Sequence, residues 1–454
     1  MPSGSIILLV PLRLHLVSLT LVLPTCTWWD DPGGLQSNCG GDTGGYSEQT
    51  DCEVGGDLDD DGHRSMECGG DDCDDHDPSI HPDANEAVWV EDVVWLAPER
   101  RSLGGFDAAR DDAGGLHVAF VARGPGVEVH YGIRGATWML DTLEAYGSTD
   151  PLPFLTPGLA AEADSTAHVA YGGPRDLMLA SGAPGGWTHR PVAESSPGRV
   201  SMALDSEGTI HVAWDFGGVW YATVRGDAVD IVQVDPTGRS PSLALSGRSP
   251  VVAYVAGLAE QDCVDAEGTA PSLRSARLDA GAWEIDAVCE VVPSDPCDSS
   301  LLTPPRIQVD AAGAAHVVFA DGRGILATDD RAGDWAVPEI QDPHGDSPAF
   351  ALDDGGSRHV AYRRDGVLRY ARNESIGREL VELSPPLWDI AIVVGVDGEP
   401  HVLFDAAGCA DWYAGDEESG RSCARWTHAL VHASPRPSED GTDRDCDGED
   451  AVED

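Results

Sequence analysis

The segment Leu204–Trp214, with the sequence LDSEGTIHVAW, is the clearest copy of a pattern that recurs along this chain. In it, an acidic turn containing glycine leads into a short run of His, Val, Ala and an aromatic residue. The corresponding runs begin at His117, His168, His211, Val251, His316, His359 and His401. A spacing of roughly 43 residues is typical of a fold built from repeated units.

Each copy is followed by further short segments in which apolar and polar residues alternate. Val219–Ala222 and Leu368–Ala371 are examples of the next segment, and a tryptophan opens another at Trp138, Trp187, Trp283 and Trp335. Four short strands per period, turns rich in Gly and Asp, and no helical periodicity indicate a β-propeller blade. The sequence therefore predicts an all-β, seven-bladed β-propeller in residues 87–434, with loop insertions in the first and fourth blades.

The last copy lacks a candidate for its outer strand. After His401–Ala406 and the segment Cys409–Cys423, only Ala424–Leu430 alternates as a third strand would. The alternating segment Ala87–Trp95 precedes the first copy and has no partner there. Because a propeller must pair its edge strands to close, we expect Ala87–Trp95 to be the outer strand of the seventh blade.

The recurring His and aromatic residues have a structural and a functional interpretation. The His positions lie on the second strand of each blade, which does not line a propeller's channel, so they cannot easily converge on a metal. A hydrogen bond repeated in every blade is the expected role, since repeats reuse the same packing. The aromatic residues are expected to form the core between blades.

Two acidic segments flank the predicted propeller. The alternate acids Asp57, Asp59 and Asp61, followed by Gly62, resemble the opening of a calcium loop, although Cys68 stands where such a loop has its twelfth-position Glu. A second acidic cluster follows at Asp71, Asp72, Asp74, Asp75 and Asp77.

Together these segments resemble the MopE-type metal-binding motif of secreted myxobacterial proteins. Residues 57–86 match its first half and residues 439–448 its second, so the motif is split by the propeller, and Glu439 replaces a Cys of the family. The resemblance implies an irregular metal-binding module formed by 57–86 and 435–454. Its candidate ligands are Asp57, Asp59, Asp61, His63, Asp71, Asp72, Asp74, Asp75, Asp77, Glu86, Glu439, Asp443, Asp445 and Asp447.

The chemistry of these donors favours calcium. Carboxylate oxygens are hard ligands that suit Ca²⁺. His63, His76 and His81 leave copper or zinc as a less favoured alternative. A solvated acidic linker without an ion is the remaining interpretation.

The N-terminus predicts export. Its apolar runs Ile6–Val10 and Leu16–Leu23 are too short to span a membrane and indicate a secretory signal. Leu23–Cys26 resembles a bacterial lipobox, which makes Cys26 a candidate lipidation site at the end of a signal 1–26; an ordinary signal peptide is the alternative. Residues 27–56 are expected to form a flexible tether.

The cysteines also fit an exported protein. Of the 11 Cys, the ten other than Cys26 could pair in an oxidising compartment. We expect disulfide bonds, including a stapled loop in the fourth blade that involves the three residues Cys263, Cys289 and Cys297.

Composition and motifs narrow the range of functions that this protein can have. The formal charge of −51, with no Lys, argues against nucleic acid or anionic lipid as partners. We expect an exported, monomeric protein, extracellular or attached to the outer membrane only through a lipid anchor, that binds a glycan or a protein at the cell surface. The alternative is a sialidase-like, glycoside-active enzyme, because the Asp-x-x-Gly turns and Arg306-Ile307 loosely resemble parts of those propellers.

Overall fold

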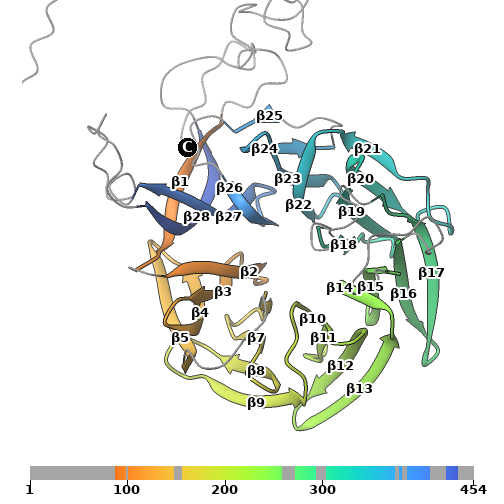
Figure 1. The fold of residues 1–454 in the computed structure, drawn as a ribbon, viewed down its shortest axis with the longest axis horizontal. Coiled ribbons are helices and arrows are strands. Elements are labelled where there is room, and N and C mark those ends of the chain that lie inside the picture. Colours follow the sequence, from red (N-terminus) through yellow and green to blue (C-terminus); the bar gives the residue numbers. More distant parts are fainter. Residues whose placement is uncertain are drawn as a thin grey trace, which may run out of the picture. The chain divides into compact units, whose positions relative to one another are not determined.

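The described part of the chain folds into seven four-stranded antiparallel sheets, arranged as the blades of a propeller around a central axis (Figure 1). The computed structural model describes residues 87–98, 101–147, 156–257, 271–292, 303–373, 378–380, 386–409 and 426–437. These residues contain strands and no helix, and so no helix long enough to cross a membrane. The predicted fold class is confirmed.

Blades one to four follow each other along the chain. The first contains β2 (Ser102–Arg110), β3 (Leu116–Arg123), β4 (Gly126–Arg134) and β5 (Trp138–Gly147). The second contains β6 (Gly158–Ala161), β7 (Ala167–Gly172), β8 (Leu177–Gly182) and β9 (Thr188–Ala193). The third contains β10 (Val200–Leu204), β11 (Ile210–Asp215), β12 (Val219–Arg225) and β13 (Ala228–Asp235). The fourth contains β14 (Gly238–Ser246), β15 (Ser249–Ala256), β16 (Ser272–Asp279) and β17 (Ala282–Glu290).

The last three blades complete the ring. The fifth contains β18 (Arg306–Val309), β19 (Ala315–Asp321), β20 (Gly324–Asp329) and β21 (Glu339–Asp342). The sixth contains β22 (Gly345–Leu352), β23 (Arg358–Arg364), β24 (Val367–Arg372) and β25 (Arg378–Glu379). The seventh contains β26 (Pro386–Val394), β27 (Pro400–Cys409), β28 (Trp426–Pro437) and β1 (Ala87–Leu96).

The seventh blade is closed by the N-terminal strand, as predicted. Strand β1 pairs antiparallel with β28, from Ala87 opposite Pro437 to Leu96 opposite Ala429 (Figure 1). Inward-facing residues of β1 also pack on the neighbouring blades: Trp89 lies 5.4 Å, between ring centroids, from Tyr370 of the sixth blade. Pairing the first and last strands of the propeller in one sheet removes two unpaired edges at once.

The aromatic residue that ends each second-strand run lies in the core between blades. All seven side chains at this position are exposed by 2% or less. They are Phe120, Tyr171, Trp214, Tyr254, Phe319, Tyr362 and Phe404. The predicted role of these residues is confirmed.

Three of these aromatic residues also join one blade to the preceding one through their hydroxyl groups. Each donates a hydrogen bond to a carboxylate on or near the outer strand of that blade. The pairs are Tyr171–Glu144 at 2.6 Å, Tyr254–Asp235 at 3.0 Å and Tyr362–Asp342 at 2.9 Å. Burial lets a tyrosine ring contribute packing while its hydroxyl still finds a partner.

The recurring histidines form the expected repeated contact. In five blades the Nε2 atom of the histidine faces a carboxylate from the turn before its strand. The pairs are His117–Asp111 (3.1 Å), His168–Glu162 (2.8 Å), His211–Asp205 (3.5 Å), His316–Asp310 (3.0 Å) and His359–Asp353 (3.3 Å). On the other side, Nδ1 of three of them faces a tyrosine hydroxyl of the third strand: Tyr131, Tyr221 and Tyr370.

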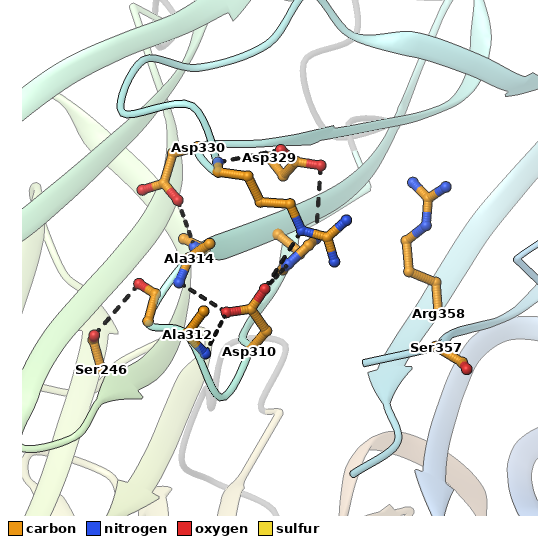
Figure 2. A network of polar contacts seen from close by, with 12 residues as sticks. Ser246, Asp310, Ala312, Ala314, Asp329, Asp330, Ser357 and Arg358 are labelled. Carbon is orange, nitrogen blue, oxygen red and sulfur yellow. Dashed lines mark hydrogen bonds and ion pairs between the residues drawn. The ribbon is translucent and has the colours of Figure 1, made fainter. Parts of the chain in front are cut away.

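The same carboxylate also holds the turn. Figure 2 shows this in the fifth blade, where Asp310 accepts hydrogen bonds from the N–H groups of Ala312 and Ala314, both at 3.0 Å. The hydrogen bond with His316, together with these N–H groups, outweighs burial and lowers the pKa of Asp310 to about 2. The histidines therefore serve the fold by linking each turn to the strands behind it.

The two blades that lack this pair differ at both positions. In the fourth blade, Val251 replaces the histidine, and the preceding turn shrinks to the two residues between Ser246 and Ser249, without an acid. In the seventh, Gly395 stands in the place of the acid, and Nδ1 of His401 lies 3.1 Å from Nε2 of His432 instead. Loss of the acid thus accompanies loss or redirection of the histidine.

Candidate functional site: the mouth of the channel

The innermost strand of each blade has one edge that faces the axis and is not paired with another strand. Its N–H groups need other acceptors. Three side chains supply them across blade boundaries. Asp107 Oδ2 accepts from Leu159 N at 3.0 Å, Ser201 Oγ from Leu243 N at 3.0 Å and Ser242 Oγ from Ile307 N at 3.2 Å.

These three side chains occupy one equivalent position in the repeat. In each blade, one residue of the inner strand is opposite the recurring histidine, or opposite Val251 in the fourth blade. The equivalent position lies two residues before that inner-strand residue. In the seven blades the position holds Asp107, Gly158, Ser201, Ser242, Arg306, Ala349 and Ala391. This position lies on the inner strands, which surround the axis (Figure 1), and five of its seven residues are small.

Arg306 behaves differently from the other members of this set. Its Nη2 donates a hydrogen bond to the carbonyl oxygen of Ile390 at 3.3 Å. Ile390 belongs to the seventh blade, so the side chain of Arg306 reaches past the sixth blade, where the equivalent residue is the small Ala349. The Nε atom of Arg306 is buried and has no hydrogen-bond partner.

A second layer of polar residues lies nearer the beginning of the inner strands. It consists of residues two positions earlier: Thr156, Arg199, Ser240, Ser347 and Asp389, all half-buried. The backbone N–H of Arg199 is held by Asp215 at 3.0 Å and that of Asp389 by Asp405 at 2.9 Å. Among the described residues, neither Arg199 nor Arg306 has a carboxylate within ion-pair distance.

Burial and mutual repulsion perturb the charges at this place. Burial raises the pKa of Asp107 to about 6, although Arg306, two N–H groups and Arg199 oppose the change. Burial, followed by the nearby charge of Arg199, lowers the pKa of Arg306 to about 10. Burial also lowers the pKa of Arg123, which Asp389 counteracts. Three guanidinium groups and two carboxylates thus lie near enough to perturb one another's charges, in a protein whose formal charge is −51.

The strands that the longest connections join have the connected ends at this end of the propeller. In an antiparallel blade, the connection from an outer strand to the next inner strand emerges at the same end as the connection between the second and third strands. The longest connections between strands of the described propeller are all of these two kinds: 148–157, 257–271, 291–305 and 410–425. The short acidic turns lie at the other end, so the two ends of the propeller differ.

Every residue predicted from the acidic motif lies outside the described residues, and so does Cys26. The structure shows only where the two acidic segments join the propeller: Ala87 and Pro437 are partners on β1 and β28. Within the described residues, no group of three or more His, Cys, Asp or Glu is arranged to hold a metal ion. The split calcium site therefore stays a prediction.

The predicted disulfide at Cys289 is not formed. Cys289, on the outer strand β17, is a free thiol, and burial raises its pKa to about 11. A stapled loop that includes this residue is therefore wrong for this structure. The proposed partners Cys263 and Cys297 lie outside the described residues.

The repeated second-strand pattern does not predict the cluster of Asp107, Arg199 and Arg306, of which only Arg306 has a sequence signal, its resemblance to a sialidase motif. A further signal is a charged residue at a repeat position that is mostly small, as at Asp107 and Arg306. This signal is weak because the first strands of the repeats are less regular than the second strands.

Comparison with known proteins finds distantly similar solved structures and no family. No protein-family model and no curated protein matches the sequence. Among solved structures, the chain is similar to a protein of unknown function from Dyadobacter fermentans (TM-score 0.46, 11% identity, covering 77% of this chain and 100% of that one). It is also similar to AofleA from Arthrobotrys oligospora (0.42, 14%, 66% and 92%) and to a catalytically inactive virginiamycin B lyase from Staphylococcus aureus (0.45, 12%, 76% and 99%). These scores are too low to carry an argument about fold, ligand or activity.

Proposed function

We propose that this protein is an exported binding propeller that recognises a glycan at the cell surface through the mouth of its channel. The observation that supports this most directly is the pair Arg199 and Arg306, two half-buried guanidinium groups without an ion-pair partner among the described residues. Packing does not account for them, since most of the equivalent positions in other blades are occupied by small residues.

The surroundings of the pair suit a polyhydroxylated ligand. Thr156, Ser240 and Ser347 place hydroxyl groups in the same layer as Arg199. Hydroxyl and charged side chains that converge in a concave site are the usual means of orienting a polar ligand. By contrast, the recurring histidines are already engaged with turn carboxylates, so they contribute to the fold and not to the site.

A glycoside-active enzyme is the second candidate, and one observation favours it. Asp107 has a pKa of about 6, close to the value that suits a general acid at neutral pH. It lies near the two guanidinium groups that would hold a substrate.

A binding screen combined with a turnover assay separates the two functions. The full exported chain is applied to a glycan array and, in parallel, to a panel of chromogenic glycosides. We expect retention on a subset of glycans and no release of chromophore above that of the variant Asp107→Asn. Turnover that disappears in Asp107→Asn would show that the protein is a glycoside-active enzyme. No retention on any glycan would contradict the proposed glycan-binding function.

We further propose that the two acidic segments bind Ca²⁺ and secure the chain ends next to the seventh blade, outside the cell. Their support is the motif resemblance, together with the pairing of Ala87 and Pro437, from which both segments continue. Binding an ion only in the folded state stabilises that state.

Chelation should therefore lower the melting temperature of the full chain. Addition of EGTA is expected to lower it by several degrees, since loss of about 1 kcal/mol shifts a domain of this size by roughly 2–4 °C. Excess Ca²⁺, but not Mg²⁺, should restore it. A melting curve that is identical with and without EGTA would show that the acidic segments act as a linker.

A further inference from the structure

The geometry of the channel mouth points to a carboxylate-bearing sugar as the ligand, with Arg199 and Arg306 binding the carboxylate. This inference rests on the proposed glycan-binding function and specifies the chemical class of its ligand. The site is formed by inner strands of different blades, with Arg306 from the fifth and Arg199 from the third. It is therefore available only once the propeller is closed.

The arrangement of Arg306 argues for a missing anion. Its guanidinium reaches across the channel and makes a single hydrogen bond with a backbone carbonyl, of Ile390, while Nε is buried without a partner. Burying a charged group is costly unless it is paired and hydrogen-bonded. Arg306 as a whole is only half-buried, and a ligand oxygen at the accessible part of its side chain would supply a charged partner.

The second guanidinium defines the position of the anion. The charge of Arg199 acts on Arg306 more strongly than the opposing charge of either Asp107 or Asp389, and Arg199 has no ion-pair partner of its own among the described residues. An anion placed between two guanidinium groups relieves this repulsion. The planar fork of arginine also matches the two oxygens of a carboxylate, which makes such hydrogen bonds stronger than neutral ones.

The remaining charges favour a singly charged group on a neutral scaffold. Asp107 and Asp389 lie in the same mouth and would repel a dianion such as phosphate or a strongly acidic peptide. Ser240 and Ser347, which are both half-buried, add hydroxyl groups of the kind that hydrogen-bond a sugar ring. A uronic or sialic acid residue combines one carboxylate with several hydroxyl groups.

The test compares acidic oligosaccharides with their methyl esters, which differ only in charge. Oligogalacturonate, a glucuronate oligosaccharide and sialyllactose are titrated by calorimetry into the full chain, each beside its ester. We expect at least one acid to bind at least tenfold more tightly than its ester, because a charge-assisted hydrogen bond contributes about 1.5–3 kcal/mol. Equal affinities for every acid and ester, or no binding by any acid, would overturn the inference.

Variants assign the carboxylate to the two arginines. Arg306→Gln and Arg199→Gln should each weaken binding of the acid by about tenfold or more while leaving that of the ester unchanged. Arg225→Gln serves as the matched control, because Arg225 is exposed, pairs with Glu207 and ends the strand β12 at the opposite end of the propeller. Unchanged affinity in both channel variants would overturn the assignment.

Stability measurements distinguish a ligand-binding role from a structural one. Removing an unpaired buried charge should leave the melting temperature of Arg306→Gln unchanged or raise it, while binding is lost. A fall in melting temperature that accompanies lost binding in both variants would make the arginines structural and overturn the inference.

The same experiments keep this inference separate from the proposed function. If neutral glycans were retained and Arg306→Gln bound them equally well, the inference of a carboxylate-bearing ligand would be refuted, while the proposed glycan-binding function would stand. Tighter binding of an oligoglutamate peptide than of any sugar acid would refute both.

Discussion

Removal of Ala87–Leu96 is expected to leave the propeller open and the protein aggregated. Without β1, the strand β28 becomes an exposed edge of the seventh blade, and the contact of Trp89 with the sixth blade is lost. Unpaired edges and exposed apolar surface promote association. Size-exclusion chromatography should show oligomers or loss of soluble protein. Deletion of residues 27–56, which precede the acidic segment, should leave a monomer of ordinary stability.

A pair of adjacent substitutions tests the same closure without a deletion. Val94 is exposed by 4% and belongs to a core cluster with Phe106 and Leu430, whereas its neighbour Val93 is exposed by 36%. Val94→Asp should lower the free energy of unfolding by more than about 3 kcal/mol, because it buries an unpaired charge. Val93→Asp should change it by less than about 1 kcal/mol. Similar effects of the two substitutions in urea unfolding would show that β1 does not seal the seventh blade.

Asp205→Ala is expected to produce the second large loss of stability, about 2–4 kcal/mol. Asp205 is buried and accepts hydrogen bonds from the N–H groups of Glu207, at 2.9 Å, and Thr209, at 2.8 Å, beside His211. The substitution leaves these donors without their acceptor. Urea unfolding at pH 7 measures the change.

A matched control lies in the fourth blade. Ser246 occupies the corresponding turn and makes only a 3.4 Å contact with the carbonyl of Gly313, so Ser246→Ala should cost less than about 0.5 kcal/mol. If Asp205→Ala were as mild as Ser246→Ala, the repeated His–carboxylate contact would not contribute appreciably to stability.

The effect of Asp205→Ala should also depend on pH. Burial opposes ionisation of Asp205, but its hydrogen bonds with Thr209, Glu207 and His211 outweigh burial and lower its pKa from 3.8 to about 2. A carboxyl group whose pKa is lowered on folding stabilises the folded state above its unfolded pKa. The difference between wild type and Asp205→Ala should therefore be constant above about pH 5 and shrink as the pH falls from about 4 towards 2.

The sequence was sufficient to predict the propeller and its closure because both depend on local, repeated patterns. The run around His211 recurs with a period that only a repeat fold explains. Ala87–Trp95 was assigned to the seventh blade by counting strands, and the observed β1 extends it by a single residue to Leu96. Once the number of strands is known, the requirement that each edge strand be paired leaves few other places for this segment.

The channel cluster could not be predicted in the same way. Arg306 and Arg199 meet only because the inner strands of different blades converge at the axis, and the distance between them in sequence carries no such information. Arg306 also differs from the mostly small residues at the equivalent position of the other blades, so the repeat pattern does not predict it. Cys289 forms no disulfide bond because of where the outer strand β17 places its thiol. The number and spacing of cysteines in the sequence do not reveal that position.

The central claim is that ligand binding takes place on the axis, at one place formed by several blades. A site repeated between blades would instead bind several ligands per chain. The stoichiometry of binding separates the two arrangements, whichever sugar is recognised.

Calorimetric titration of the full chain with its tightest-binding acidic oligosaccharide measures this stoichiometry directly. We expect a single ligand per chain, and loss of that binding in Arg306→Gln. Two or more equivalent ligands per chain, still bound by Arg306→Gln, would contradict it.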